Sequence, residues 1–126
     1  MAIDLGRTHA RNPQWTGHAR FHVVWQAVST FALSAIEVLL LLAPGVHASE
    51  RFYLAAGLAA VPMLGFAIAF GARAVFGGTL SDPNGMRPAR VTWNGGQYLV
   101  DLNLAAEIAG IAALITIVAA YVHAAA

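Results

Sequence analysis

Three long runs of apolar residues dominate the chain, and polar residues are concentrated in the segments that separate them. The hydrocarbon core of a bilayer is about 30 Å thick, and a helix needs roughly 20 apolar residues to cross it. The pattern predicts membrane-spanning helices over residues 21–43, 52–76 and 97–122. The first run ends at a Pro-Gly pair and the second follows a Ser-Glu pair, which are typical signals for a helix end and a helix start.

The polar segments define the rest of the predicted organisation. Residues 1–20 contain charged and amide side chains but no apolar stretch of the signal-peptide type, so we expect them to remain as an N-terminal segment. Residues 77–96 are rich in Gly, Pro and Asn, which indicates an irregular connection. We therefore predict an all-α fold, an integral membrane helical bundle with three transmembrane helices, in a single membrane domain over residues 1–126.

The composition agrees with a protein embedded in lipid. The chain is 59% hydrophobic and only 10% charged. A soluble domain carries about 25% charged residues, because its surface faces water. The net charge of +1 provides no basic face for a nucleic acid, so the expected partners are membrane lipids and a lipophilic small molecule. There is no cysteine, which excludes disulfides and thiolate chemistry.

The arginines predict how the chain is oriented in the membrane. Six of the seven arginines lie in residues 1–20, in residues 77–96 or at the end of the second run, and Arg51 is the exception. An odd number of spans places these segments on one side, and arginine-rich loops stay on the cytoplasmic side. We expect a cytoplasmic N-terminus and an external C-terminus in a bacterial inner cell membrane.

The polar residues of the first predicted helix fall on one face. An ionisable side chain inside a membrane costs a few kcal/mol, so each one is a candidate functional residue. At about 100° per residue and with His18 at zero, His22 falls near 40° and Gln26 near 80°. Glu37 follows near 100°, closer to the outer membrane surface. Trp25, near 340°, lies at the edge of this stripe, where it either lines a pocket or packs against a neighbouring helix.

The other two predicted helices add polar groups at the same depth. The second helix ends on the cytoplasmic side, which places Arg73 level with the two histidines of the first helix. The third helix begins there, which places Gln97 and Asp101 in the same layer, while Glu107 lies deeper, near the midplane. We therefore expect the three helices to bring imidazole, guanidinium, amide and carboxylate groups together beneath the inner leaflet.

These residue types suit acid–base chemistry on a lipophilic molecule, such as isomerisation, epoxide opening or cyclisation. A histidine transfers protons near neutral pH, and a carboxylate orients it or accepts the proton itself. We predict that His22 and Asp101 form the acid–base pair and that Arg73 binds negative charge. No G-x-S-x-G nucleophile motif is present, and we expect no cofactor. The expected substrate-binding residues are His18, Gln26, Gln97, Trp25 and Glu107.

Two other interpretations of this cluster stay open. The i, i+4 spacing of His18 and His22 is that of a metal-binding pair, but a metal would need a third ligand, which Asp101 on the third helix could supply. We rank this below acid–base use and expect no bound metal. Arg73 and Asp101 are also suited to a structural ion pair that locks the helices together.

Residues 12–22 carry the pattern N-P-x-W-x-x-H-A-R-F-H at the entrance to the first helix. This pattern resembles the opening of a family of small, uncharacterised integral membrane proteins of bacteria and fungi, which provides no activity to transfer. A more distant similarity is to sterol-isomerase-like membrane enzymes, which also place histidine and acidic residues in a small helical bundle but have more spans. The resemblance favours a functional role for His18 and His22.

The sequence thus predicts a small intramembrane enzyme that performs acid–base chemistry on a lipophilic substrate. Three helices make a thin wall around a pocket, so we expect a homo-oligomer to complete it. One alternative is a non-catalytic subunit of a larger membrane complex, with the polar stripe as its docking surface. Another is a small transporter or proton-conducting element, for which Glu37 and Glu107 would matter as much as Asp101.

Overall fold

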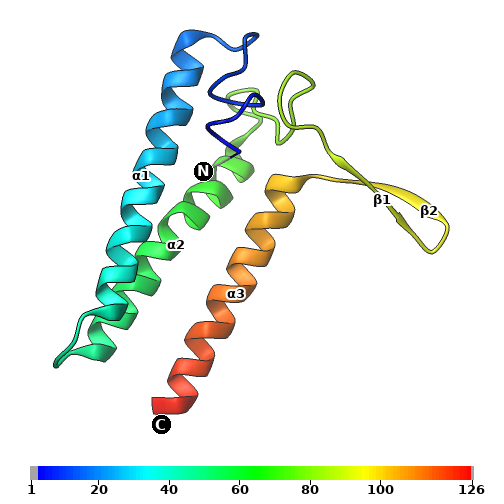
Figure 1. Cartoon of the computed structure of the whole chain (residues 1–126). Coiled ribbons are helices and arrows are strands. Elements are labelled where there is room, and N and C mark those ends of the chain that lie inside the picture. Colours follow the sequence, from blue (N-terminus) through cyan, green and yellow to red (C-terminus); the bar gives the residue numbers. More distant parts are fainter. Residues whose placement is uncertain (1–2, 126) are drawn as a thin grey trace.

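The computed structural model describes residues 3–125 of the chain. Three long helices account for most of it, and a short antiparallel hairpin stands apart from them (Figure 1). The elements follow in the order α1 (Gly17–Leu42), α2 (Ala48–Ala72), β1 (Ala89–Trp93), β2 (Gly96–Val100) and α3 (Leu102–Ala125).

All three helices are long and apolar enough to cross a membrane, which confirms that part of the prediction. They contain 26, 25 and 24 residues. At about 1.5 Å per residue, even the shortest is roughly 36 Å long, against a hydrocarbon core of about 30 Å. The helices begin four or five residues away from the predicted bounds: α1 and α2 start earlier, and α3 starts later.

The all-α prediction is wrong for residues 89–100, which form the hairpin of β1 and β2. Its tip is the Asn94-Gly95 pair, and both residues have a positive φ, 48° and 77°. A two-residue turn with positive φ at both positions matches the twist of the flanking strands, and Asn-Gly is its preferred sequence. The sequence predicted an irregular connection up to residue 96 and the start of the third helix at residue 97. The β-branched and aromatic residues on either side of the turn favour strands instead.

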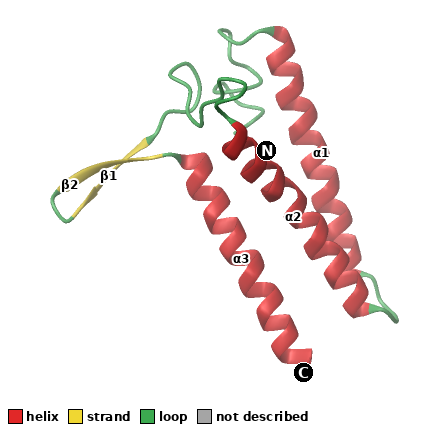
Figure 2. Ribbon diagram, turned by 180° about the vertical axis from the view of Figure 1, so that it is seen from behind, coloured by secondary structure: helices red, strands yellow, loops and turns green. Residues whose placement is uncertain are grey.

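Helix α2 lies between α1 and α3 and packs against both (Figures 1 and 2). Among residues 3–125, the only buried apolar side chains are Ala27 and Ala55. A Cβ added at Gly110 of α3 would lie 3.1 Å from the terminal methyl of Met63 on α2, so the two helices approach closely at this glycine. Small residues at contacts and large apolar residues exposed outside suit a helical bundle surrounded by lipid.

The polar segments divide unequally between the two ends of the helices. Residues 3–16, residues 73–88 and the hairpin gather at one end, which we call the loop end (Figure 1). The opposite end, the turn end, holds the α1–α2 turn and the last residues of α3. There the Phe52 and Tyr121 rings stack with centroids 3.7 Å apart, and the Ser49 and Tyr121 hydroxyls are hydrogen-bonded at 3.0 Å. These contacts join the start of α2 to the end of α3.

Arg51 of α2 closes the α1–α2 turn. Its Nε donates to the Leu40 carbonyl at 3.2 Å, and its Nη2 donates to the Ala43 carbonyl at 2.8 Å. Its Nη1 donates to the Val46 carbonyl in the turn itself. The last carbonyls of a helix have no partner within the helix, and near lipid they have little water to bind. One planar guanidinium therefore provides donors for several of these groups at once.

We expect Arg51→Lys to lower the free energy of unfolding by about 1–3 kcal/mol. Lysine keeps the positive charge and has three N–H donors, but these share one nitrogen and cannot reproduce the spacing of the guanidinium donors at three carbonyls. The measurement is unfolding in mixed micelles with increasing SDS, followed by helicity. Arg90→Lys, at an exposed position of the hairpin, is the matched control and should leave the midpoint unchanged. Equal midpoints for both variants would show that Arg51 acts only through its charge.

Candidate functional site

An open groove of about 1130 Å³ runs between the three helices and continues under the N-terminal segment. We call it the interhelical groove. Most of its wall is apolar, and α2 provides much of that surface through residues such as Val61, Met63 and Phe66. Its polar and charged lining residues are Asp4, His9, Gln26, Thr30, Ser34, Arg73, Thr79, Asn103 and Glu107.

The polar side chains that α1 contributes are four residues apart. Gln26, Thr30 and Ser34 lie along one side of the helix and all line the groove. On a wheel with His18 at zero they fall near 80°, 120° and 160°. The groove-facing side of α1 is therefore rotated away from the arc of 0–100° that the sequence predicted. Among the polar residues of α1, only Gln26 belongs to both.

His18 and His22 lie outside the groove lining, and both are exposed. Their Nε2 atoms are 3.1 Å apart, so the two imidazoles are hydrogen-bonded to each other. The Trp25 ring follows on the same surface, with its centroid 5.7 Å from that of His22. Within residues 3–125 no group of three or more His, Asp or Glu side chains is placed to hold a metal ion. The predicted third ligand, Asp101, is thus not added to the histidine pair.

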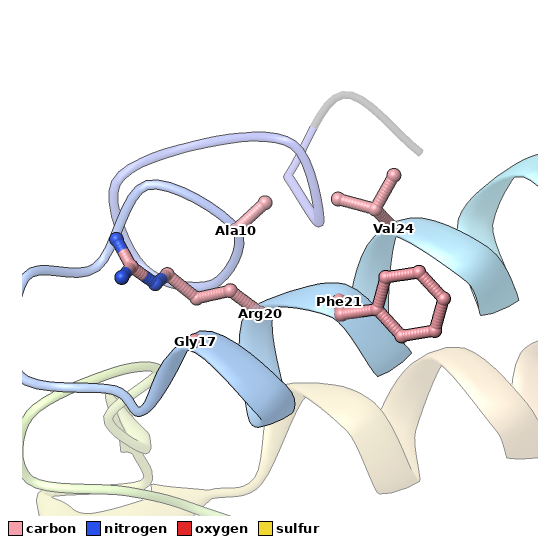
Figure 3. A pocket seen from close by; sticks show the side chains of 5 residues that line it. All are labelled: Ala10, Gly17, Arg20, Phe21 and Val24. Carbon is pink, nitrogen blue, oxygen red and sulfur yellow. The ribbon is translucent and has the colours of Figure 1, made fainter.

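A second hollow, of about 380 Å³, lies on the outside of α1 near its start. Figure 3 shows its five lining residues, with the Arg20 side chain extending away from Phe21 and Val24. Ala10 and Gly17 complete the lining, so Arg20 supplies its one ionisable side chain. A lone guanidinium provides no acid–base pair. The interhelical groove is the better candidate, because it combines acidic, basic and amide groups in one space.

Arg73 follows the last residue of α2 and lines the groove. Its Nη1 donates to the Phe70 carbonyl at 2.6 Å, and its guanidinium carbon lies 4.1 Å from the centroid of the Phe70 ring. These two contacts hold the positive charge at the loop end of the groove. The structure shows no ion pair between Arg73 and Asp101, both of which belong to the described part of the chain.

Asp101 caps the start of α3. Its Oδ1 accepts the backbone N–H groups of Asn103 at 3.0 Å and Leu104 at 3.1 Å. An aspartate in this position satisfies donors that have no partner within the helix. Capping of α3 gives the Asp101 carboxylate a structural role. Asp101 does not line the groove. Asp101 and His22, the predicted acid–base pair, are thus not brought together in it.

The prediction that Gln97 lies on the third helix is wrong. Gln97 lies on β2, where it is exposed and opposite Thr92 of β1. The helix begins only at Leu102, after the Asp101 cap. Two polar residues of α3 do line the groove, Asn103 and Glu107. Glu107 was predicted as a site residue and is half-buried, whereas Asn103 was not among the predicted site residues.

The N-terminal segment reaches the groove because Asn12 fastens it to the connection that follows α2. Asn12 is only 2% exposed, and its Nδ2 donates to the Asn84 carbonyl at 2.5 Å. Its Oδ1 accepts the backbone N–H of Gln14 at 3.0 Å. A Cβ added at Gly85 would lie 3.0 Å from the Thr8 carbonyl oxygen, so a side chain here would crowd this approach.

This docking brings Asp4 and His9 into the groove lining, where the sequence had not placed them. The His9 ring also meets Trp15 edge to face, with centroids 5.2 Å apart. The Asn and Trp of the N-P-x-W pattern therefore have structural roles. The Asn12-Pro13 pair indicates a turn in the sequence, but the sequence alone does not reveal its contact with Asn84, which lies 72 residues further along the chain.

Comparison of the chain with models of protein families, with curated proteins and with solved structures found no match. The resemblance of residues 12–22 to a family of small membrane proteins stays a prediction. The groove's own geometry therefore carries the functional argument.

The capping role of Asp101 can be separated from a catalytic one. We expect Asp101→Ala to lower the free energy of unfolding by about 1 kcal/mol, while Asp101→Asn keeps it, because asparagine caps a helix as well as aspartate. SDS-induced unfolding measures both. An equal loss of stability in the two variants would mean that the negative charge, and not the hydrogen bonds, acts at this position.

The Asn12 contact can be tested by limited trypsin digestion after Arg7. We expect Asn12→Ala to speed cleavage about tenfold, since losing a buried hydrogen-bonding side chain makes opening of the segment easier by about 1.4 kcal/mol. Asn84→Ala is the matched control, because Asn84 takes part in this contact only through its backbone carbonyl. Similar rates for the two variants would show that side-chain hydrogen bonds do not hold the segment.

Proposed function

We propose that this chain is an integral membrane protein that binds a lipophilic molecule in the interhelical groove and performs acid–base chemistry on its polar end. The observation that carries the proposal is the composition of the groove. An apolar wall adjoins a cationic group, an imidazole, two carboxylates and two amides. Ligand sites combine mostly apolar walls with a few polar groups in this way.

The depth of these groups fits a molecule with a polar head and an apolar tail. Arg73 follows the last residue of α2, and Asn103 and Glu107 lie in the first two turns of α3. All three are therefore near the loop end, while Met63 and Val61 line the groove further from it. A tail would extend toward the membrane interior, and the head would remain near the leaflet boundary.

The roles follow from charge and position. Arg73 would bind an anionic head group or a developing oxyanion. Glu107 and His9 both line the groove and are the candidates for proton transfer. In an isomerisation, one of them removes a proton from the substrate and the other returns a proton at a new position, so no further reagent is needed. This assigns the acid–base step to Glu107 and His9 in place of Asp101 and His22.

The charge distribution supports an orientation with the loop end in the cytoplasm of a bacterial inner membrane. Arg51 alone lies at the turn end, and the other arginines lie near the loop end or in the segments that form it. Positively charged segments are retained on the cytoplasmic side. The C-terminus would then be external. Because the groove is open to the outside, we also propose that a second copy of the chain closes it.

Binding is tested with the purified protein in detergent micelles and a dansyl-labelled fatty acid as the probe. We expect Arg73→Gln to weaken binding about tenfold, since it removes a charge-assisted contact to the carboxylate. Arg90→Gln, an exposed arginine on the hairpin, is the matched control and should bind as the wild type does. Equal affinity in both variants would remove Arg73 from the site and, with it, the head-group assignment.

Chemistry is tested on lipids extracted from the host membrane, incubated with the protein in D₂O and analysed by mass spectrometry. Proton abstraction and return would incorporate deuterium, and Glu107→Gln should abolish it. Glu37→Gln is the control, because Glu37 is a half-buried carboxylate that does not line the groove. Incorporation that survives in Glu107→Gln would contradict the assigned role. Fatty-acid binding without any incorporation would favour a carrier or a transporter over an enzyme.

A further inference from the structure

The β1–β2 hairpin extends sideways from the loop end, and its tip lies far from the helices (Figures 1 and 2). Only Asp101 separates the last residue of β2 from the first residue of α3. The hairpin therefore lies at the level at which α3 would enter a membrane. The groove chemistry proposed above does not use it.

The two faces of the hairpin differ sharply. Residues that pair across an antiparallel ladder have side chains on the same face. Val91 pairs with Tyr98, and Trp93 pairs with Gly96. On the other face Arg90 pairs with Leu99, and Thr92 pairs with Gln97. With Ala89 and Val100 at its base, the first face is wholly apolar or aromatic, and we call it the aromatic face.

The aromatic face is uncovered within residues 3–125. Trp93 is 67% exposed and Tyr98 is 55% exposed, and Val91 beside them is also exposed. An isolated two-stranded hairpin is marginally stable in water and needs a surface to pack against. The chain supplies no such surface of its own in the described residues, so something outside it must cover this face.

The bilayer is the surface that the geometry brings to the hairpin. A strand that leaves the axis of a membrane-spanning helix sideways runs along the interface between head groups and acyl chains. Tryptophan and tyrosine are enriched at that interface, because each combines an apolar ring with a polar group. Arg90 on the opposite face and Arg87 just before β1 add positive charges, which anionic head groups attract.

We infer that the hairpin Ala89–Val100 is a membrane-interface anchor that lies along the bilayer surface. Its aromatic face contacts the acyl chains, and the Arg90 face contacts phosphates and water. Because the hairpin is joined to α3 through one residue, the anchor fixes the depth of α3, and with it the depth of Asn103 and Glu107 in the groove. The inference depends on membrane insertion of α3 and is independent of any reaction in the groove.

The test uses the full chain in phosphatidylcholine vesicles with Trp15→Phe and Trp25→Phe, so that Trp93 is the single remaining tryptophan. Lipids carry a nitroxide either near the head group or deep in the acyl chain. We expect blue-shifted Trp93 emission, strong quenching by the shallow label, weaker quenching by the deep label, and little quenching by iodide in the water. Helicity by circular dichroism confirms that the variant is folded.

The matched control moves the indole to the other face of the same strand, through Thr92→Trp combined with Trp93→Phe in the same background. Its emission should be red-shifted, with iodide quenching gained and lipid quenching reduced. Equal lipid quenching of the two positions would overturn the assignment of faces. Strong iodide quenching of Trp93 would show a hairpin in water. Protection of Trp93 from both lipid and iodide would show a protein cover, and either result would overturn the anchor. Normal Trp93 quenching in an Arg73→Gln variant that no longer binds the fatty acid would show that the anchor does not depend on ligand binding in the groove.

Discussion

Every backbone N–H and C=O that enters a bilayer must find a partner within the protein, because the hydrocarbon offers none. The ends of the elements show how this chain meets the requirement. Arg51 bonds the carbonyls that end α1, and the Asp101 carboxylate bonds the N–H groups that begin α3. The hairpin, which leaves one edge of each strand unpaired, lies beyond the helix ends. Polar and charged residues thus have structural roles at the end of α1 and at the start of α3.

The packing of the three helices explains why a groove exists. Three helices with many small residues pack closely at a few points, such as Gly110 against Met63, and cannot fill the space between all three. In water an unfilled apolar groove would collapse or recruit a partner, whereas in a membrane a lipid-like molecule can occupy it. The polar residues that line the groove near the loop end then meet whichever part of that molecule is polar. The proposed function makes use of the space that this packing leaves.

The sequence was sufficient for features set by local pattern and insufficient for those set by rotation or distant contacts. Apolar run length identified three helices because their period and length are local properties. The lengths of the apolar runs also gave the depths of Arg73, Gln26 and Glu107 in the membrane, and all three residues line the groove. The prediction failed for His22 because a wheel gives relative angles but not which angle faces a neighbouring helix. It failed for His9 because the Asn12 contact spans 72 residues.

Asp101 illustrates why a residue type cannot be read without its place in an element. A carboxylate four residues after the start of a predicted span looks costly and therefore functional. Once the strand before it is recognised, the same residue becomes the first polar group outside the helix, with two backbone N–H donors to bind. The predicted helix start at residue 97 therefore also led to the prediction that Asp101 lies inside the membrane-spanning helix, whereas it caps the start of α3. Glu107, six residues further on, has no such terminal position to explain it, and a half-buried acid facing an apolar groove is the stronger reason to look for proton transfer there.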